Sequence, residues 1–359
     1  MEIRLLHASE MKDAVGLADS IFRSDGRVSM GDSLPKVFSK SLLQSIGAFD
    51  NGRLVSFAGL VPSIVRIHES RLTVYSYGAV CTHPDYRGQG YARRMLRYVQ
   101  EHARLSGASL LLVSGVLPIY IEGGCSPFGT AVSHRLTREN LRGLAENEGH
   151  GNLRFREAGE ADWFGLHKLA DGRRVRYEQS IWDLADLLEA QAVAALRGRR
   201  QFTFMAELDD VPVAFCTAAV SQVTGDGQEV VNPVIEWAGD ERYLTALLSH
   251  MTACLPAEYL NMVVPWHEQG LLDRLRDAYT GTEKNQGTVH VLDAELLITQ
   301  LGPYWKERGA DSQLLDRLRH MTDHKQLVSL LFDTPEEKPG LLCDVLPVPF
   351  PYTKGLNFV

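Results

Sequence analysis

A strand, a turn with two glycines and a long helix follow one another between residues 70 and 107, and they constrain the fold more than any other feature. The turn reads HPDYRGQGYARRM, and Pro84 ends the β-rich segment before it because proline cannot donate to a strand ladder. Gly88 and Gly90 tolerate backbone conformations that other residues avoid, and an amphipathic helical pattern begins at once. The sequence therefore predicts several backbone N–H groups converging at the positive end of a helix.

Such a set of amides is suited to a pyrophosphate. The dinucleotide-binding fingerprint fits poorly, because it needs a third glycine where Arg93 stands, and the nucleotide-triphosphate loop fits poorly because it needs a Gly-Lys-Ser/Thr sequence that is absent. A turn that only connects a strand to a helix remains the structural alternative.

The elements around this turn alternate between strand and helix patterns, and the second part of the chain repeats their order. A strand and helix pattern precedes a hairpin with the turn Asp50-Asn51-Gly52. Residues 153–171 resemble this strand and helix pattern, and residues 202–223 resemble the hairpin. Because the repeat lacks the arginine and the glycines, we infer two domains of one ancestry, the second degenerate.

The last part of the chain differs from both. It has two helical patterns and ends in LPVPFPYTKGLNFV, which is too apolar for a frayed tail and is predicted to pack on the protein. We therefore expect an α/β fold of two tandem mixed-sheet domains and a small C-terminal α+β piece. The expected boundaries are 1–150, 151–287 and 288–359.

Composition excludes several classes of protein. No apolar stretch of signal-peptide or membrane-span length is present, so we expect a cytoplasmic protein without a membrane partner. The five cysteines are odd in number and form no C-x-x-C pair, which argues against a disulfide framework and a metal site. The net charge is −8, and the sequence shows no concentration of basic residues that would form a basic face. No nucleic acid partner is therefore expected.

The segment AVCTHPDYRGQGYARRML resembles the signature of the GNAT superfamily of acetyl-CoA-dependent N-acetyltransferases, a strand followed by Arg/Gln-x-x-Gly-x-Gly/Ala at the start of a long helix. The resemblance covers residues 1–140 and implies acetyl-CoA as co-substrate. It implies that the pyrophosphate binds the backbone amides of Arg87, Gly88, Gln89, Gly90, Tyr91 and Ala92, and that the pantetheine pairs with Val80, Cys81 and Thr82.

The whole chain resembles the enhanced-intracellular-survival type of acetyltransferase, with tandem GNAT-like domains and a C-terminal piece that is shorter here. This resemblance implies transfer of an acetyl group to a primary amine of a small cationic molecule or a lysine-bearing acceptor. A non-catalytic acyl-CoA sensor and a scaffold are the alternatives, and the oligomeric state stays open.

Catalytic groups are expected from two places. Tyr120 and Gly124 match the Tyr-x-x-x-Gly pattern with which these enzymes place a tyrosine beside the sulfur, although Cys125 stands where an aromatic residue is usual. A phenol with a pKa near 10 can protonate a departing thiolate; alternatively, Tyr120 only packs. In the resembling family the terminal carboxylate takes the amine proton, here that of Val359, with Glu122 as the alternative base.

The acceptor is expected at the loop of residues 22–35, because GNAT proteins vary most in this region. Asp25 and Asp32 are the candidate contacts for a cationic amine, although loop carboxylates are more often only solvated.

Overall fold

The computed structural model describes residues 2–23, 28–146, 152–221, 230–334 and 345–359. The chain forms two compact units. Unit 1 comprises Met1–Gly129, Asn285–Val348 and Val359, and unit 2 comprises Thr130–Lys284 and Pro349–Phe358. Within the described residues, no helix has the length and apolarity needed to span a membrane.

Unit 1 contains a mixed sheet in the order β1-β2-β3-β4-β5-β14. Neighbouring strands are antiparallel, except for β4 and β5, which are parallel. Asn51 and Gly52 both have positive φ between β2 and β3, which confirms the predicted hairpin turn. The strands are β1 (Glu2–Leu5), β2 (Ile46–Asp50), β3 (Arg53–Ile67), β4 (Ser70–Thr82), β5 (Leu110–Val113) and β14 (Thr288–Val291).

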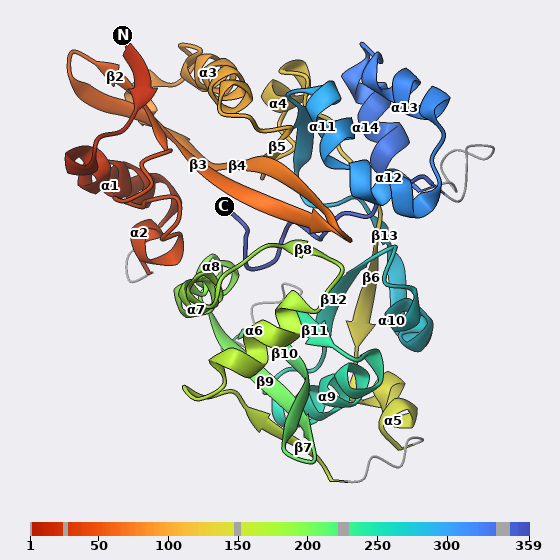
Figure 1. The fold of residues 1–359 in the computed structure, drawn as a ribbon. Coiled ribbons are helices and arrows are strands. Elements are labelled where there is room, and N and C mark those ends of the chain that lie inside the picture. The colour runs from red at the N-terminus through yellow and green to blue at the C-terminus, as the bar shows by residue number, and fades with distance from the viewer. Residues whose placement is uncertain (1, 24–27, 147–151, 222–229, 335–344) are drawn as a thin grey trace. The chain divides into compact units, whose positions relative to one another are not determined.

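Helices cover both faces of this sheet, with α1 and α2 on one face and α3 on the other (Figure 1). Alternation along β3 explains the two layers, because Ala58 and Leu60 pack in the cluster that contains α3, whereas Phe57 stacks on Phe38 with ring centroids 5.0 Å apart. The helices of unit 1 are η1 (Ala8–Glu10), α1 (Met11–Phe22), α2 (Met30–Ser33), η2 (Pro84–Tyr86), α3 (Tyr91–Leu105), α4 (Pro118–Glu122), α11 (Ala294–Gln300), α12 (Gly302–Arg308), α13 (Ser312–Arg319) and α14 (His324–Phe332).

Unit 2 contains two sheets, in the orders β11-β10-β9-β7 and β12-β6-β13. Its strands are β6 (Ala131–Leu136), β7 (Leu153–Glu157), β8 (Val175–Tyr177), β9 (Arg199–Leu208), β10 (Val211–Ser221), β11 (Val234–Gly239), β12 (Leu260–Pro265) and β13 (Tyr279–Glu283). Its helices are α5 (Arg138–Glu146), α6 (Trp163–Asp171), α7 (Ile181–Ala190), α8 (Ala192–Ala195), α9 (Glu241–Cys254), α10 (Gln269–Arg274) and η3 (Arg276–Ala278).

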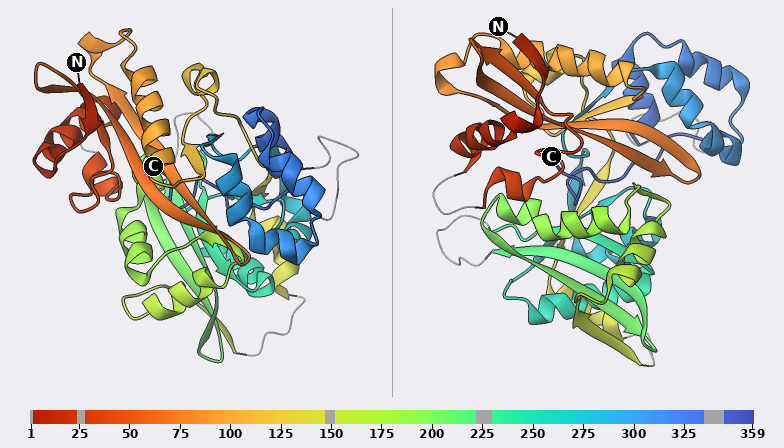
Figure 2. Two further views of the ribbon diagram at one scale, coloured as in Figure 1. Left: turned by 45° about the horizontal axis from the view of Figure 1, so that its top comes forward. Right: turned by 60° about the vertical axis from the view of Figure 1, so that its left-hand side comes forward.

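Strand β10 shows why unit 2 also has two helical layers. Cys216 and Ala218 are fully buried in the cluster that contains α9, whereas the alternate residues Phe215 and Ala219 are fully buried in the cluster that contains α6, α7 and α8. The layers of α9 and of α6 can be followed in Figure 2.

Two strands pair with strands that are distant in the sequence. Strand β6 follows the elements β1 to β5 in the sequence but pairs with β12 of unit 2, and β14 follows the main part of unit 2 but pairs with β5 of unit 1. Each unit therefore needs a strand from a distant part of the sequence to complete its sheet.

Candidate active site

Strand β4 bulges in the middle of the unit 1 sheet. Phe57 of β3 pairs with Cys81 and Gly59 pairs with Gly78, so two residues of β4 stand opposite one residue of β3. The first of the two, Ala79, has a φ of +49°, a conformation that costs energy for a residue with a side chain. A bulge leaves a residue outside the ladder. The bulged part of β4 therefore has backbone groups that are available for another partner.

A pocket of about 710 Å³ lies beside the residues that follow the bulge. Strands β4 and β5 are paired only as far as Tyr77 and Val113, so they separate just before the bulge. The pocket is lined by the end of β4, the glycine turn, the first turn of α3 and helix α4, and Ile21 of α1 also contributes. An opening between parallel strands next to a helix N-terminus is a common ligand site in α/β sheets.

The glycine turn has the geometry that the sequence predicted. Gly88 and Gly90 have φ values of +75° and +78°, which favour glycine. A Cβ atom at either position would meet no atom within 4 Å, so the space beside the turn is open. Gly90 caps α3 and has no side chain to bind the first amides of this 15-residue helix. These N–H groups are therefore available to an anion at the positive end of the helix.

Eight of the nine residues predicted to bind the coenzyme line this pocket, and Gln89 is not among them. The side-chain amide of Gln89 instead donates to the carbonyl oxygen of Asp85 at 3.4 Å. The eight lining residues are Val80, Cys81, Thr82, Arg87, Gly88, Gly90, Tyr91 and Ala92.

Tyr120 lies on α4, lines the pocket and is only 7% exposed. Its ring packs edge to face on Tyr77, with centroids 6.2 Å apart. A Cβ atom at Gly115 would lie 2.8 Å from the ring, so the glycine leaves the space that the ring occupies. Burial raises the pKa of Tyr120. The phenol therefore keeps its proton at neutral pH and can donate it.

Helix α4 is held by three polar contacts. Glu122 forms an ion pair with Arg93 of α3. Gln100, also on α3, donates to the carbonyl oxygen of Gly123 at 2.8 Å. His290 of β14 lies with Nδ1 3.0 Å from the carbonyl oxygen of Gly124, and since a carbonyl only accepts, Nδ1 carries the hydrogen. Sequence reasoning missed Gln100 and His290, because no local pattern links them to α4.

Glu122 and Cys125 occupy different environments. The Glu122 side chain is 58% exposed, and its carboxylate forms an ion pair with Arg93. This carboxylate is the one expected from the sequence as the alternative base. Cys125, which replaces the usual aromatic residue, is fully buried, and burial raises its thiol pKa to about 11. Burial likewise raises the pKa of Cys81 to about 12. Both thiols are therefore protonated and poor nucleophiles at neutral pH.

The terminal carboxyl group of Val359 belongs to unit 1 and lies against Gly78. A Cβ atom at Gly78 would be 2.2 Å from the Val359 oxygen and 2.6 Å from Oγ of Ser114. Only glycine leaves room for the carboxyl group here. The carboxyl therefore lies at the point where β4 and β5 separate, one residue before the bulge.

The structure describes one of the two candidate acceptor contacts. Asp25 lies outside the described residues, and Asp32 is an exposed residue in the first turn of α2 that does not line the pocket. Among the described residues, no cluster of three or more histidine, cysteine or carboxylate side chains has the arrangement of a metal site.

Comparisons with known proteins address the first part of the chain most directly. Residues 2–128 match the family model described as the acetyltransferase (GNAT) domain. A search among curated protein sequences finds no match.

Solved structures extend the likeness over most of the chain. Eis1 from Mycobacterium abscessus is similar at 15% identity and a TM-score of 0.59, with 83% of this chain and 75% of that chain covered. GCN5-related N-acetyltransferases from Anabaena variabilis and Kribbella flavida are similar at 10% and 18% identity, with TM-scores of 0.63 and 0.59. Each comparison covers 83% of this chain and 74% of the other. At these identities the likeness shows a shared fold.

Proposed function

We propose that this chain, an acyltransferase that belongs to the GNAT acetyltransferases through residues 2–128, moves an acetyl group from acetyl-CoA to a primary amine. The family itself implies an acyl-CoA co-substrate, and the resemblance seen in the sequence is confirmed at this level. The observation that carries the finer proposal is the open pocket of about 710 Å³ in which the bulged strand, the uncapped start of α3 and Tyr120 meet.

The pocket supports a specific assignment of the coenzyme. The first amides of α3 and of the turn at Gly88 and Gly90 are suited to the pyrophosphate, because they lie at the positive end of the helix dipole and have open space beside them. The edge of β4 at Val80, Cys81 and Thr82 is suited to the amide groups of the pantetheine arm, which would pair with it as an added strand.

Direct attack of the amine on the thioester uses three groups of this chain. The amine nitrogen forms a bond to the carbonyl carbon, and a backbone N–H of the β4 bulge stabilises the resulting oxyanion. When the carbon–sulfur bond breaks, Tyr120 donates its proton to the thiolate. The raised pKa of the phenol keeps that proton in place until the sulfur becomes basic.

The carboxylate of Val359 accepts the proton that the amine loses. Its place beside Gly78 and Ser114, next to the bulge and the separation of β4 and β5, supports this role. A carboxylate is a weak base toward an ammonium ion in water, and removal from water raises its basicity. The carboxylate of Glu122 is less suited, because Arg93 already pairs with it.

We also infer that the two parts of the chain share one ancestor and that the second has lost its coenzyme site. In unit 2, β7, β9, β10 and β11 pair in the order of β1, β2, β3 and β4, and β11 also has a bulge opposite Thr217 and Ala218. The expected domains at 1–150, 151–287 and 288–359 remain our proposal for this ancestry, although each compact unit also includes exchanged segments.

The acceptor class is a primary amine of a small cationic molecule or of lysine, which suits the acidic chain with its net charge of −8. Release of free thiol from acetyl-CoA, measured with aminoglycosides, spermidine, lysine peptides and aryl amines, tests the proposal. We expect turnover with at least one cationic amine. Tight binding of acetyl-CoA without thiol release for any amine would instead support an acyl-CoA sensor.

A further inference from the structure

Strand β14 contacts the part of unit 1 that carries Tyr120. Residues 114–126, hereafter the Tyr120 loop, leave the sheet where β5 ends at Val113, and they contain α4. Strand β14 pairs with β5, and its residue Val289 exchanges two backbone hydrogen bonds with Ser126, of 2.8 and 2.9 Å. Because the backbone groups of neighbouring residues in a strand point to opposite edges, β14 lies between β5 and Ser126. The Tyr120 loop therefore begins at one edge of β14 and ends at the other.

The side chain of Thr288 on β14 contacts the Tyr120 loop both before and after α4. It is buried, and its hydroxyl donates to the carbonyl oxygen of Gly115 at 3.1 Å. Gly115 lies against Tyr120, because a Cβ atom there would be 2.8 Å from the ring. The hydroxyl also forms a hydrogen bond with the thiol of Cys125. Since the hydroxyl hydrogen is directed to Gly115, the thiol is the donor in this second bond.

Cys125 links this contact to Tyr120 through the backbone. Its N–H donates to the carbonyl oxygen of Tyr120 at 3.0 Å. The thiol is fully buried and is a weak donor, whereas a phenylalanine ring at this position would have no donor for the hydroxyl of Thr288. The departure from the usual aromatic residue at position 125 therefore has a partner in Thr288.

His290 adds a second contact from the same face of β14. Side chains two residues apart in a strand lie on one face, so His290 and Thr288 both face the Tyr120 loop. Nδ1 of His290 donates to the carbonyl oxygen of Gly124 at 3.0 Å. A Cβ atom at Gly124 would be 3.1 Å from the imidazole ring, so the two residues are in direct contact. Two consecutive residues after α4, Gly124 and Cys125, are thus bound to β14.

We propose that Thr288, Cys125 and His290 are positioning residues for the phenol of Tyr120. The inference rests on the proposed function, in which this phenol protonates the departing thiolate. All three lie within the described residues and outside the lining of the pocket, so they act through the Tyr120 loop. A general acid must lie within about 2.6–3.2 Å of the atom that it protonates. Contacts before and after α4 limit displacements of the phenol, which would lower the rate of proton transfer.

Removal of the Thr288 hydroxyl tests this role. Thr288→Val keeps the shape of the side chain but leaves the carbonyl of Gly115 and the thiol of Cys125 without this partner. We expect kcat to fall by about 5- to 20-fold, with unchanged KM and calorimetric affinity for acetyl-CoA. Thr288→Ser retains the hydroxyl and should keep kcat within about 2-fold of the wild type. Thr245→Val in unit 2 is the matched control, because Thr245 is also buried and donates to the carbonyl of Glu241 at 3.0 Å.

The contact of His290 is tested by a second pair of variants. His290→Leu removes the donor to Gly124, whereas His290→Asn keeps an N–H at about the position of Nδ1. We expect kcat to be about 2- to 10-fold lower in His290→Leu and close to the native value in His290→Asn. Equal kcat in the two variants would remove His290 from the positioning residues.

A double-mutant cycle with Tyr120→Phe separates positioning of the phenol from a general effect on the fold. Thr288→Val should lower kcat in the wild type and have no further effect in Tyr120→Phe, because the group that it positions is then absent. An equal fall in both backgrounds, or native kcat in Thr288→Val, would overturn the positioning role and leave the acid role of Tyr120 intact. Native kcat in Tyr120→Phe itself would contradict the acid role, and the positioning role with it.

Discussion

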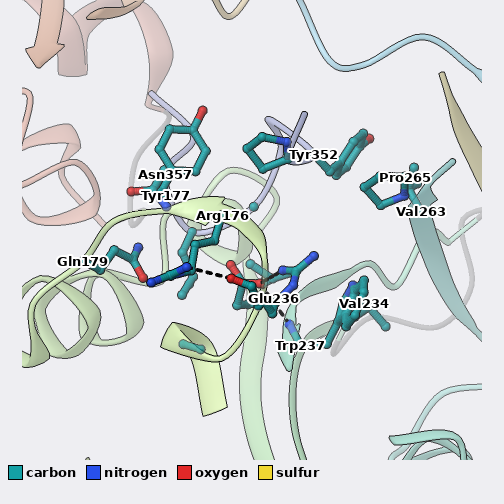
Figure 3. Close-up of a pocket in the computed structure, with 16 residues that line it drawn as sticks. Arg176, Tyr177, Gln179, Val234, Glu236, Trp237, Val263, Pro265, Tyr352 and Asn357 are labelled. Carbon is teal, nitrogen blue, oxygen red and sulfur yellow. Dashed lines mark hydrogen bonds and ion pairs between the residues drawn. The ribbon is translucent and has the colours of Figure 1, made fainter. Parts of the chain in front are cut away.

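Units 1 and 2 repeat one order of strands, yet the pocket beside β4 has a volume of about 710 Å³ and the cavity beside β11 (Figure 3) has one of about 40 Å³. The bulge does not account for this difference, because both β4 and β11 have one. The helices that follow these strands also start differently. Gly90 begins α3 without a side-chain cap, whereas the carboxylate of Asp240 accepts a hydrogen bond from the backbone N–H of Arg242 at the start of α9.

We propose that such a difference removed a coenzyme site from unit 2. A capping carboxylate satisfies the amides that an anion would otherwise bind, and it repels a second negative charge. On this proposal, the same order of strands carries a coenzyme site in unit 1 and none in unit 2.

The largest effect is expected from giving Gly90 the carboxylate that unit 2 has at Asp240. Gly90→Asp should abolish acetyl-CoA binding, because its carboxylate would compete for the amides that bind the pyrophosphate and repel it. Gly198→Asp in unit 2 is the matched control, since Gly198 also has positive φ, at +61°, and open space beside it. Calorimetry that shows unchanged affinity in a folded Gly90→Asp protein would contradict the site.

Removal of one hydroxyl group tests the chemistry in unit 1. Tyr120→Phe should lower turnover by on the order of 10²- to 10⁴-fold and leave acetyl-CoA affinity unchanged, since a general acid acts only as the thiolate forms. Tyr259→Phe in unit 2 is the control, because Tyr259 is 8% exposed and Tyr120 is 7% exposed. Native turnover in Tyr120→Phe would leave the phenol with a packing role alone.

The pH dependence of the same reaction follows from the direction of the Tyr120 pKa. Because burial raises this pKa above the usual value of 10.0, the phenol stays protonated as pH rises toward that value. Loss of the Tyr120 proton should therefore cause no fall in turnover between about pH 7 and pH 9. A fall in that range that disappears in Tyr120→Phe would show that the phenol titrates lower than its burial predicts.

Extension of the chain by two residues replaces the Val359 carboxylate with a peptide bond. We expect turnover to fall by about 10- to 100-fold, less than the full effect of a general base because water can relay part of the proton. Acetyl-CoA affinity should stay the same. Turnover at the native rate in the extended protein would remove Val359 from the mechanism.

A smaller effect is expected from the contacts that hold α4. Gln100→Leu removes the hydrogen bond to the carbonyl of Gly123 and should lower kcat by about 2- to 10-fold with little change in the KM of acetyl-CoA. Gln201→Leu is the control, because Gln201 donates to the carbonyl of Leu188 in unit 2 at the same distance of 2.8 Å. Equal kinetics of the two variants would show that the contact does not position Tyr120.

Local chemistry made part of this molecule predictable. The positive φ that Asn51 and Gly52 favour marked the hairpin, and the glycines at 88 and 90 marked the turn before α3. The predicted helix from Tyr91 to the end at Gly107 is confirmed as α3, with Gly107 at a φ of +81° just beyond it.

Other features depend on residues that are distant in sequence. An alanine gives no signal for a bulge, so Ala79 was not predicted. Gly78 is required because the carboxyl group of Val359 lies against it, and only the folded chain brings the two together. The pairing of β6 with β12 and of β14 with β5 was likewise not predictable, because the residue pattern of a strand does not indicate which strand it pairs with.

The number of acetyl-CoA molecules bound per chain tests the comparison between the units most directly. Titration calorimetry of the whole protein should give one site, and Gly90→Asp should remove it. The pocket beside β4 has the space for the coenzyme, whereas the cavity of unit 2 holds about 40 Å³. Two sites per chain, or one site that survives Gly90→Asp, would contradict the assignment of the coenzyme to unit 1 alone.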